Sequence, residues 1–290
     1  MDLPIVVGVD GSEPSLRAVD WAADEADLRG VPLNVVYACL WDRYEGAALA
    51  RELGKTSTQV LPQEITGAAV RRVLGRHPDL RVTADVVFED PESALVRESR
   101  NACALVVGNR GRSGLAEALL GSVGLTVAAH AHCPVVVLRG SHDNQATPPV
   151  HGRIVVGVGE SAEDSAAVRF AFEEARRRGV PLEAVRAWRC PAHETTDHPL
   201  LADAPARLHE QNAEETLAKA LRDAPRDVEL HRRTVEGHAR RVLVDASHGA
   251  DLLIIGAKRR TGHLGLQLGR VAHTALHHSA CPVAVVPQPA

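Results

Sequence analysis

The chain repeats itself, and this duplication limits its possible fold more than any other feature of the sequence. Ile5–Val9 returns unchanged as Ile154–Val158, 149 residues later, and Cys133–Val135 returns as Cys281–Val283 after 148 residues. Two copies of one architecture, with almost no net insertion, account for the length of 290 residues. The sequence therefore predicts a first domain at 1–140, a second domain at 153–290, and a polar, proline-containing linker at 141–152 between them.

Within each copy, short apolar runs alternate with longer segments of helical periodicity. In the first copy we expect strands near 4–9, 33–39, 81–88, 104–108 and 134–138, and helices near 14–29, 58–76, 91–101 and 121–131. Strands that are apolar on both faces are typical of a parallel sheet covered by helices. Each copy is therefore predicted to be an α/β domain with a doubly wound, five-stranded parallel sheet, a Rossmann-like fold. The stretch 42–57 lacks clear periodicity and is expected to be a surface loop.

Composition excludes several classes of protein. The net charge of −4 and the aromatic content of 3% provide neither a basic field nor stacking platforms for nucleic acid. The longest apolar runs, such as 104–107 and 252–255, are far shorter than the roughly 20 residues that cross a bilayer. No basic segment precedes the first strand, so we expect a cytoplasmic protein without a secretory signal. Five cysteines without a CxxC pair predict reduced, mostly buried thiols.

A glycine-rich segment follows the fourth predicted strand. Glycines at 108, 111 and 114 permit positive φ angles and let backbone N–H groups approach an anion. Gly121 and Ser122 then open a helix, where an N-cap hydroxyl and the helix N-terminus would meet a phosphate. The segment therefore indicates a phosphate site, and the alternative is a glycine-rich turn with an ordinary serine cap.

A second part of this candidate site follows the first strand, where Gly8 and Val9 lead to Asp10. In a parallel sheet, ligands bind beyond the carboxyl ends of the strands, at the switch in strand order. Strands one and four both end there, so Asp10 and the Gly108 segment are expected to face one cleft. A carboxylate accepts hydrogen bonds from a ribose hydroxyl or an adenine amine. The alternative is that Asp10 or Ser12 caps the following helix.

The pattern Gly-x2-Gly-x9-Gly-Ser, present as Gly108, Gly111, Gly121 and Ser122, resembles the ATP-binding signature of the universal stress protein family. The Val-Gly-Val-Asp-Gly-Ser opening and the Cys-Pro-Val-Val-Val ending are similar to that family too, in its tandem two-domain arrangement. The resemblance implies that ATP, with or without Mg²⁺, is the ligand, with Asp10 on the adenosine and Ala38 near the adenine. The ATP-binding residues that it implies are Gly8, Asp10, Ala38, Gly108, Asn109, Arg110, Gly111, Arg112, Ser113, Gly114, Gly121 and Ser122.

The second copy departs from this pattern. Gly159 replaces Asp10, Arg259 replaces Gly111 and Arg270 replaces Ser122, and the degenerate second site comprises Gly157, Gly256, Arg259, Gly262, Gly269 and Arg270. We expect the second domain to bind ATP weakly, differently or not at all. The alternative is that Lys258, Arg259, Arg260 and Arg270 attract phosphates by charge.

Three other signals are set aside. Gly54-Lys55-Thr56 resembles the end of a Walker A loop, but Leu49 stands where that motif needs glycine. Gly157–Ala162 matches a relaxed dinucleotide fingerprint, but the acidic residue expected after the next strand is missing. The histidines near two cysteines, which are His130 and His132 near Cys133 and His273, His277 and His278 near Cys281, indicate exposed histidines and buried thiols at a helix end rather than a metal site.

No catalytic set emerges from the sequence, which favours nucleotide binding, or very slow hydrolysis, over an efficient enzyme. The resemblance implies a nucleotide-dependent regulatory or stress-response module that holds ATP mainly in its first domain. The alternatives are a slow hydrolase of ATP or another adenine nucleotide, and an interaction protein without nucleotide. The resemblance also implies that Pro134–Leu138 and Pro282–Val286 pair the two domains within one chain, and a homodimer of whole chains is a further possibility.

Overall fold

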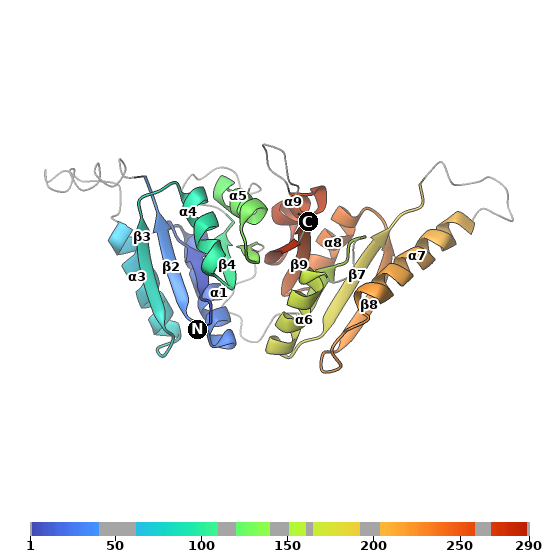
Figure 1. The fold of residues 1–290 in the computed structure, drawn as a ribbon, viewed down its shortest axis with the longest axis horizontal. Helices are drawn as coiled ribbons and strands as arrows, with labels where there is room; N and C mark the ends of the chain where they lie inside the picture. The colour runs from blue at the N-terminus through green and yellow to red at the C-terminus, as the bar shows by residue number, and fades with distance from the viewer. Residues whose placement is uncertain are drawn as a thin grey trace, which may run out of the picture. The chain divides into compact units, whose positions relative to one another are not determined.

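The structure is a computed structural model, which describes residues 2–40, 62–109, 120–139, 151–160, 165–191, 204–258 and 268–288. The chain divides into two compact units, of which one contains Met1–Arg139 and the other Ala146–Ala290. Each unit is a parallel sheet with helices on both faces, so the predicted fold class is confirmed (Figure 1). The predicted loop at 42–57 and most of the predicted linker lie outside the described residues.

The sheet of the first unit has the order β3-β2-β1-β4-β5, and its neighbouring strands are parallel. Its strands are β1 (Ile5–Gly8), β2 (Leu33–Ala38), β3 (Val82–Val87), β4 (Ala104–Gly108) and β5 (Val135–Leu138). Its described helices are α1 (Glu13–Arg29), α3 (Pro62–Arg76), α4 (Pro91–Glu98), the short 3-10 helix η1 (Ser99–Asn101) and α5 (Ser122–His130). Helices α1 and α3 pack together on one face of the sheet, and α4 and α5 on the other. These bounds agree with the predicted segments to within a few residues.

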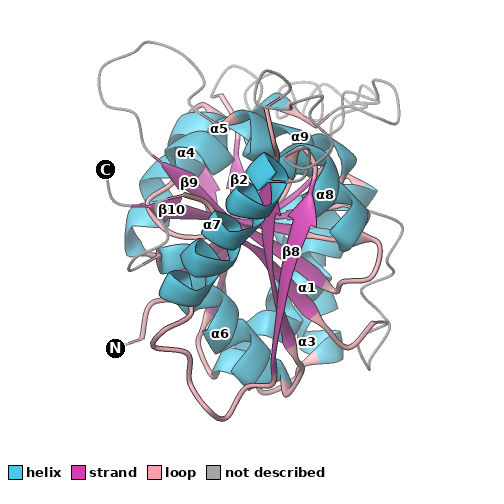
Figure 2. Ribbon diagram, turned by 90° about the vertical axis from the view of Figure 1, so that its right-hand side faces the viewer, coloured by secondary structure: helices cyan, strands magenta, loops and turns pink. Residues whose placement is uncertain are grey.

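The second unit repeats this arrangement with the order β10-β9-β6-β7-β8, again parallel. Its strands are β6 (Ile154–Gly157), β7 (Leu182–Trp188), β8 (Leu230–Glu236), β9 (Leu252–Lys258) and β10 (Val283–Gln288). Its described helices are α6 (Ala166–Arg178), α7 (Ala204–Ala220), α8 (Ala239–Ser247) and α9 (Arg270–His278). Figure 2 shows α7 lying along β8, which it contacts together with β7. No helix within the described ranges is long and apolar enough to cross a membrane.

Helix α1 illustrates how local sequence sets the fold. Ser12 accepts a hydrogen bond from the backbone N–H of Ser15 and so caps the start of the helix. Ala18, Ala22 and Ala26 are fully buried at a spacing of four residues, so one face of small side chains packs against the sheet. Gly30 ends the helix in the left-handed conformation, with φ of 65°, which favours glycine. The second unit uses the same ending at the equivalent glycine, with φ of 63°.

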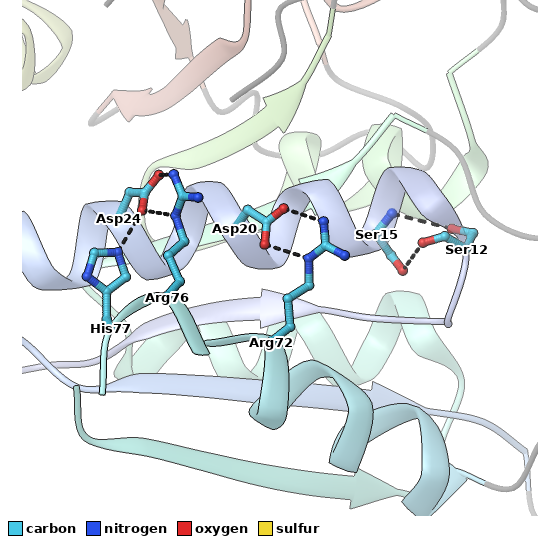
Figure 3. A network of polar contacts seen from close by, with 7 residues as sticks. All are labelled: Ser12, Ser15, Asp20, Asp24, Arg72, Arg76 and His77. Carbon is cyan, nitrogen blue, oxygen red and sulfur yellow. Dashed lines mark hydrogen bonds and ion pairs between the residues drawn. The ribbon is translucent and has the colours of Figure 1, made fainter. Parts of the chain in front are cut away.

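Two arginine–aspartate pairs join α1 to α3 on this face of the first sheet (Figure 3). The guanidinium of Arg72 donates two hydrogen bonds of 2.6 Å to the carboxylate of Asp20, whose side chain is only 7% exposed. One turn further along, Arg76 and His77 both contact the carboxylate of Asp24. The hydrogen bonds that Arg72 donates to Asp20 raise the pKa of Arg72, so its guanidinium stays charged at any ordinary pH.

We expect Asp20→Ala to lower the free energy of unfolding of the first domain by about 2 kcal/mol, because it leaves the Arg72 guanidinium without its carboxylate beside a buried surface. Denaturant unfolding followed by circular dichroism measures this change. The control is Asp227→Ala, which breaks the bidentate pair of Asp227 with Arg176 in the second domain. Both of those side chains are about half exposed, at 57% and 49%, so little change is expected there. Equal losses in the two variants would contradict this account.

Candidate functional site

The candidate site lies at the carboxyl edge of the first sheet. Strand β1 pairs with β2 on one side and with β4 on the other, so the strand order switches direction at β1. Ligands of doubly wound folds bind at such a switch point, beyond the carboxyl ends of the strands. The topology brings three predicted site segments to this edge: Gly8–Asp10 after β1, Ala38 at the end of β2, and Gly108–Asn109 at the end of β4.

Asp10 is held in place by the start of α1. Its Oδ1 accepts hydrogen bonds from the backbone N–H of Ser12, at 3.0 Å, and from the Ser12 hydroxyl, at 2.6 Å. Gly11 makes this turn possible with a φ of 81°, a conformation that favours glycine. The helix-cap alternative thus holds for Ser12, which caps α1 beside Ser15 in Figure 3, while Asp10 orients that cap. The carboxylate of Asp10 is partly exposed at the edge of the sheet.

Gly108 is required by close packing. A Cβ atom added there would lie 2.7 Å from both the carbonyl carbon and the carbonyl oxygen of Pro14, and 3.0 Å from the backbone nitrogen of Ser15. Any side chain at this position would therefore collide with the first turn of α1. Gly108 does not adopt the positive φ that glycine permits, since it is absent from the described glycines that have one. The physical reason for glycine is the approach of the two backbones.

The glycine-rich loop is closed at its base. The backbone N–H of Gly121 donates a 2.9 Å hydrogen bond to the carbonyl oxygen of Asn109, which joins the two ends of the loop. Gly121 is the N-cap of α5 and supplies no side-chain acceptor to the first turn. Ser122 is exposed and is the first helical residue, one position later than the N-cap predicted for it. The N–H groups of this turn thus lack a side-chain cap, which suits an anion.

The predicted site residues between these ends lie outside the described residues; they are Arg110, Gly111, Arg112, Ser113 and Gly114. Gly8 serves packing, because a Cβ atom there would lie 2.9 Å from the end of the Leu95 side chain on α4. Ala38 is partly exposed at the end of β2. Sequence reasoning missed Gly11, which forms the turn after Asp10, and Gly124, where a Cβ atom would lie 3.2 Å from the Leu120 side chain and at an ordinary contact distance of 3.7 Å from the carbonyl oxygen of Gly108. The Asp-Gly-Ser turn was a signal for the first of these.

The equivalent edge of the second domain is built differently. The amide of Gln288 lies over Gly256, since a Cβ atom on that glycine would be 2.8 Å from the Gln288 Nε2 atom. The Gln288 Oε1 atom accepts a 3.1 Å hydrogen bond from the backbone N–H of Ala166, at the start of α6. Strands β9 and β10 also stay paired as far as Gln288 and Lys258, whereas the matching pair in the first domain stops at Gly108 and Leu138. The backbone after Gly256 is thus part of the sheet.

The charges at this edge also differ between the domains. Gly159 occupies the position of Asp10, and nothing lies within 4 Å of the place where its Cβ would be. Arg186, on the neighbouring strand β7, donates a 3.2 Å hydrogen bond to the carbonyl oxygen of Val158. Gly269 is the N-cap of α9 and Arg270 its first, exposed residue, while Gly157 packs against Leu243 of α8 as Gly8 packs in the first domain. Arg259 and Gly262 lie outside the described residues.

The two cysteines beside the histidines are buried as predicted, while the histidines differ in exposure. Cys133 and Cys281 are buried, and His130 and His278 are exposed at the ends of α5 and α9. The rings of His273 and His277 lie 4.4 Å apart, centroid to centroid, on α9. Within the described ranges no group of three or more histidine, cysteine, aspartate or glutamate side chains could hold a metal ion.

These features define a tandem α/β protein whose first domain brings the described ends of the predicted site segments to the switch point of its sheet. A family model described as "Universal stress protein family" matches residues 3–139 and 151–287, and the chain belongs to this family. The universal stress protein Rv2005c of Mycobacterium tuberculosis is 34% identical over 295 residues, covering 98% of this chain and 97% of the relative. Rv1996 of the same organism is 34% identical over 312 residues, covering 99% and 96%. A crystal structure of a universal stress protein from Archaeoglobus fulgidus shares the fold, with a TM-score of 0.67, 18% identity and 98% coverage of both chains.

We expect Gly108→Ala to lower the free energy of unfolding of the first domain by about 1–3 kcal/mol, because the new methyl group meets backbone atoms that cannot rotate away. Gly256→Ala is the matched control in the second domain, where the methyl group meets only the movable end of Gln288. There we expect a loss below about 1 kcal/mol. Thermal and denaturant unfolding of both variants measure the difference. A loss at Gly256 as large as that at Gly108 would contradict the packing argument.

Proposed function

We propose that the protein binds ATP at the carboxyl edge of its first domain and acts as a nucleotide-dependent regulatory module in a stress response. The observation that supports this most is the Gly108–Ser122 segment. It leaves a central strand, is closed at its base by a backbone hydrogen bond, and opens a helix without a side-chain cap. The same segment carries the pattern that resembles the ATP-binding signature of the family to which the chain belongs.

One part of this sheet edge suits the nucleoside of a nucleotide, and another part suits its phosphates. Asp10 and Ala38 lie at the ends of β1 and β2, where a carboxylate can accept hydrogen bonds from the nucleoside. Gly121 and Ser122 lie across β1, beyond β4, where the positive end of α5 favours phosphate groups. ATP would therefore span the switch point with its nucleoside toward β2, with or without Mg²⁺ on its phosphates.

The proposal is for binding rather than efficient turnover. Among the predicted site residues Asp10 is the one carboxylate, and its Oδ1 already accepts two hydrogen bonds from Ser12. Its place at the nucleoside end also keeps it from the phosphate end, where a water molecule would need a general base. Any hydrolysis by the described side chains is therefore expected to be slow.

We propose further that the second domain does not hold ATP in the same way. Gly159 offers no carboxylate to a nucleoside, and Gln288 covers Gly256, where the phosphate loop would begin. Because β9 and β10 stay paired beyond Gly256, the backbone groups that follow this glycine belong to the sheet. Arg270 adds charge at the start of α9, which suits an anion but replaces the serine of the signature. A cytoplasmic location, pairing of the domains through their last strands and a homodimer stay predictions from the sequence.

We expect Asp10→Gly, which copies the residue of the second domain, to weaken ATP binding about 10-fold to 100-fold, the value of one or two hydrogen bonds to a charged group. Titration calorimetry of the full chain measures the dissociation constant. The control is Ser12→Ala, which removes the same 2.6 Å hydrogen bond from its other partner and leaves the carboxylate in place. For this variant we expect lower stability, by about 1 kcal/mol, and a change in affinity below about threefold.

Equal weakening in both variants would mean that Asp10 acts only through the helix start. A wild-type chain without measurable ATP binding would favour the interaction protein without nucleotide. Release of phosphate from ATP at the rate at which ATP binds would favour the hydrolase instead, if this release is lost in Asp10→Gly.

A further inference from the structure

Two cysteines of the first domain lie just before two neighbouring strands, at the amino edge of its sheet and opposite the candidate nucleotide site. Leu105 of β4 is the register partner of Val135 of β5. Two residues before each partner the chain has a cysteine, Cys103 and Cys133. Both cysteines lie in bends just before their strands begin, and the parallel pairing of β4 with β5 brings these two bends to the same edge of the sheet.

Hydrogen bonds fix the backbone at Cys103 and next to Cys133. The backbone N–H of Cys103 donates to the carbonyl oxygen of Pro4 at 2.9 Å. The residue before Cys133 is fixed as well, because the backbone N–H of His132 donates to the Ser99 hydroxyl at 2.9 Å. The two thiols also interact electrostatically. Burial raises the pKa of Cys133 to about 12, and the charge of a Cys103 thiolate contributes to the rise.

The two thiols differ in reactivity. Cys133 is buried, whereas Cys103 is partly exposed. Burial raises the pKa of Cys103, but the guanidinium of Arg29 opposes that rise through its charge and a hydrogen bond to the thiolate. Arg29 is kept beside Cys103 by its ion pair with Glu25, in which both side chains are buried, at 7% and 1% exposed. Cys103 is therefore the thiol that an oxidant reaches first, and Cys133 is the neighbour that can resolve it.

The second domain has the same scaffold with one thiol removed. Cys281 matches Cys133, and the hydrogen bond from Ala280 N–H to the Ser247 hydroxyl, also 2.9 Å, matches that from His132 to Ser99. Asp251 stands in the place of Cys103 and accepts hydrogen bonds from backbone N–H groups at 2.9 and 3.0 Å. The pairing of two thiols thus belongs to the first domain, and the second provides an internal control.

We propose that Cys103 and Cys133 form a site of reversible oxidation, in which a hydroperoxide converts the two thiols into a disulfide bond. The Cys103 thiolate attacks one peroxide oxygen, the O–O bond breaks, hydroxide leaves, and Cys103 becomes a sulfenic acid. The Cys133 sulfur then attacks the Cys103 sulfur, the S–O bond breaks, and the departing hydroxide takes the Cys133 proton as water. With hydrogen peroxide, two thiols lose two electrons in total and the oxidant becomes two water molecules. A dithiol reductant reverses the bond by exchange.

The bond closes a covalent loop from Cys103 to Cys133, which contains β4, the Gly108–Ser122 segment and α5. Such a loop restricts the unfolded chain, so oxidation is expected to raise the thermal midpoint of the first domain. This inference does not rest on the proposed ATP binding, because it concerns the opposite edge of the sheet.

The test is to treat the full chain with hydrogen peroxide, alkylate the remaining thiols, digest it with trypsin without reduction, and analyse the peptides by mass spectrometry. We expect the peptide with Cys103 to be linked to the peptide with Cys133, with the loss of two hydrogen atoms, and dithiothreitol to release the link. Arg110 and Arg112 separate the two peptides. Cys281 is expected to remain a free thiol and therefore to be fully alkylated. The proposal would be overturned if Cys103 is oxidised while Cys133 remains a free thiol and is alkylated. A link from Cys103 to any other cysteine would also overturn it.

Two variants test the pairing of the cysteines in a second way, one by removing a thiol and one by adding a thiol. Cys103→Ser is expected to abolish the link, with Cys133 then alkylated once unfolded. Asp251→Cys installs the missing partner in the second domain and is expected to create a new link to Cys281. The wild-type rate should also rise about tenfold per pH unit below the pKa of Cys103, because the thiolate is the nucleophile. A rate that does not change with pH would contradict attack by this thiol.

Discussion

The contact between Gly108 and the first turn of α1 is the packing constraint on which the candidate site depends. It places the end of β4 directly against the backbone of Pro14 and Ser15. The same turn holds Asp10 through Ser12, so the ends of β1 and β4 and the start of α1 form one rigid corner. Because backbone atoms make this contact, only glycine fits at the end of β4. The site is thus positioned by the framework of the domain.

The two copies have kept their packing and changed their carboxyl edges. In both domains a leucine side chain packs against the glycine that ends the first strand. This leucine is Leu95 of α4 in the first domain and Leu243 of α8 in the second. In the second domain, however, the amide of Gln288 takes the place above Gly256, and longer strand pairing continues past it. A duplicated fold can therefore retain its core while one site becomes a different polar surface, since the core requires only volume and apolarity, and the site requires particular backbone groups.

The sequence predicted the fold well because its signals are local. Apolar runs located the strands, and the duplication predicted equivalent elements in the two copies, such as the helices that are capped by Gly30 and Gly179. The ends of β1 and β4 could be placed at one edge from topology alone. Long-range contacts could not be predicted: Asp20 and Arg72 are 52 residues apart, and Gln288 reaches Ala166 across 122 residues. Such contacts depend on how helices lie on the sheet, about which residue types and spacing carry little information.

The most direct test of the central claim, a working first site and an altered second site, is to denature the purified full chain and quantify the released nucleotide by chromatography and mass spectrometry. We predict about one ATP per chain after incubation with ATP and removal of the excess. Near two per chain would contradict the account of the second domain, because Gln288 and Arg270 would then be compatible with binding. No nucleotide at all would leave the fold and the family in place and would contradict the function proposed for the first domain.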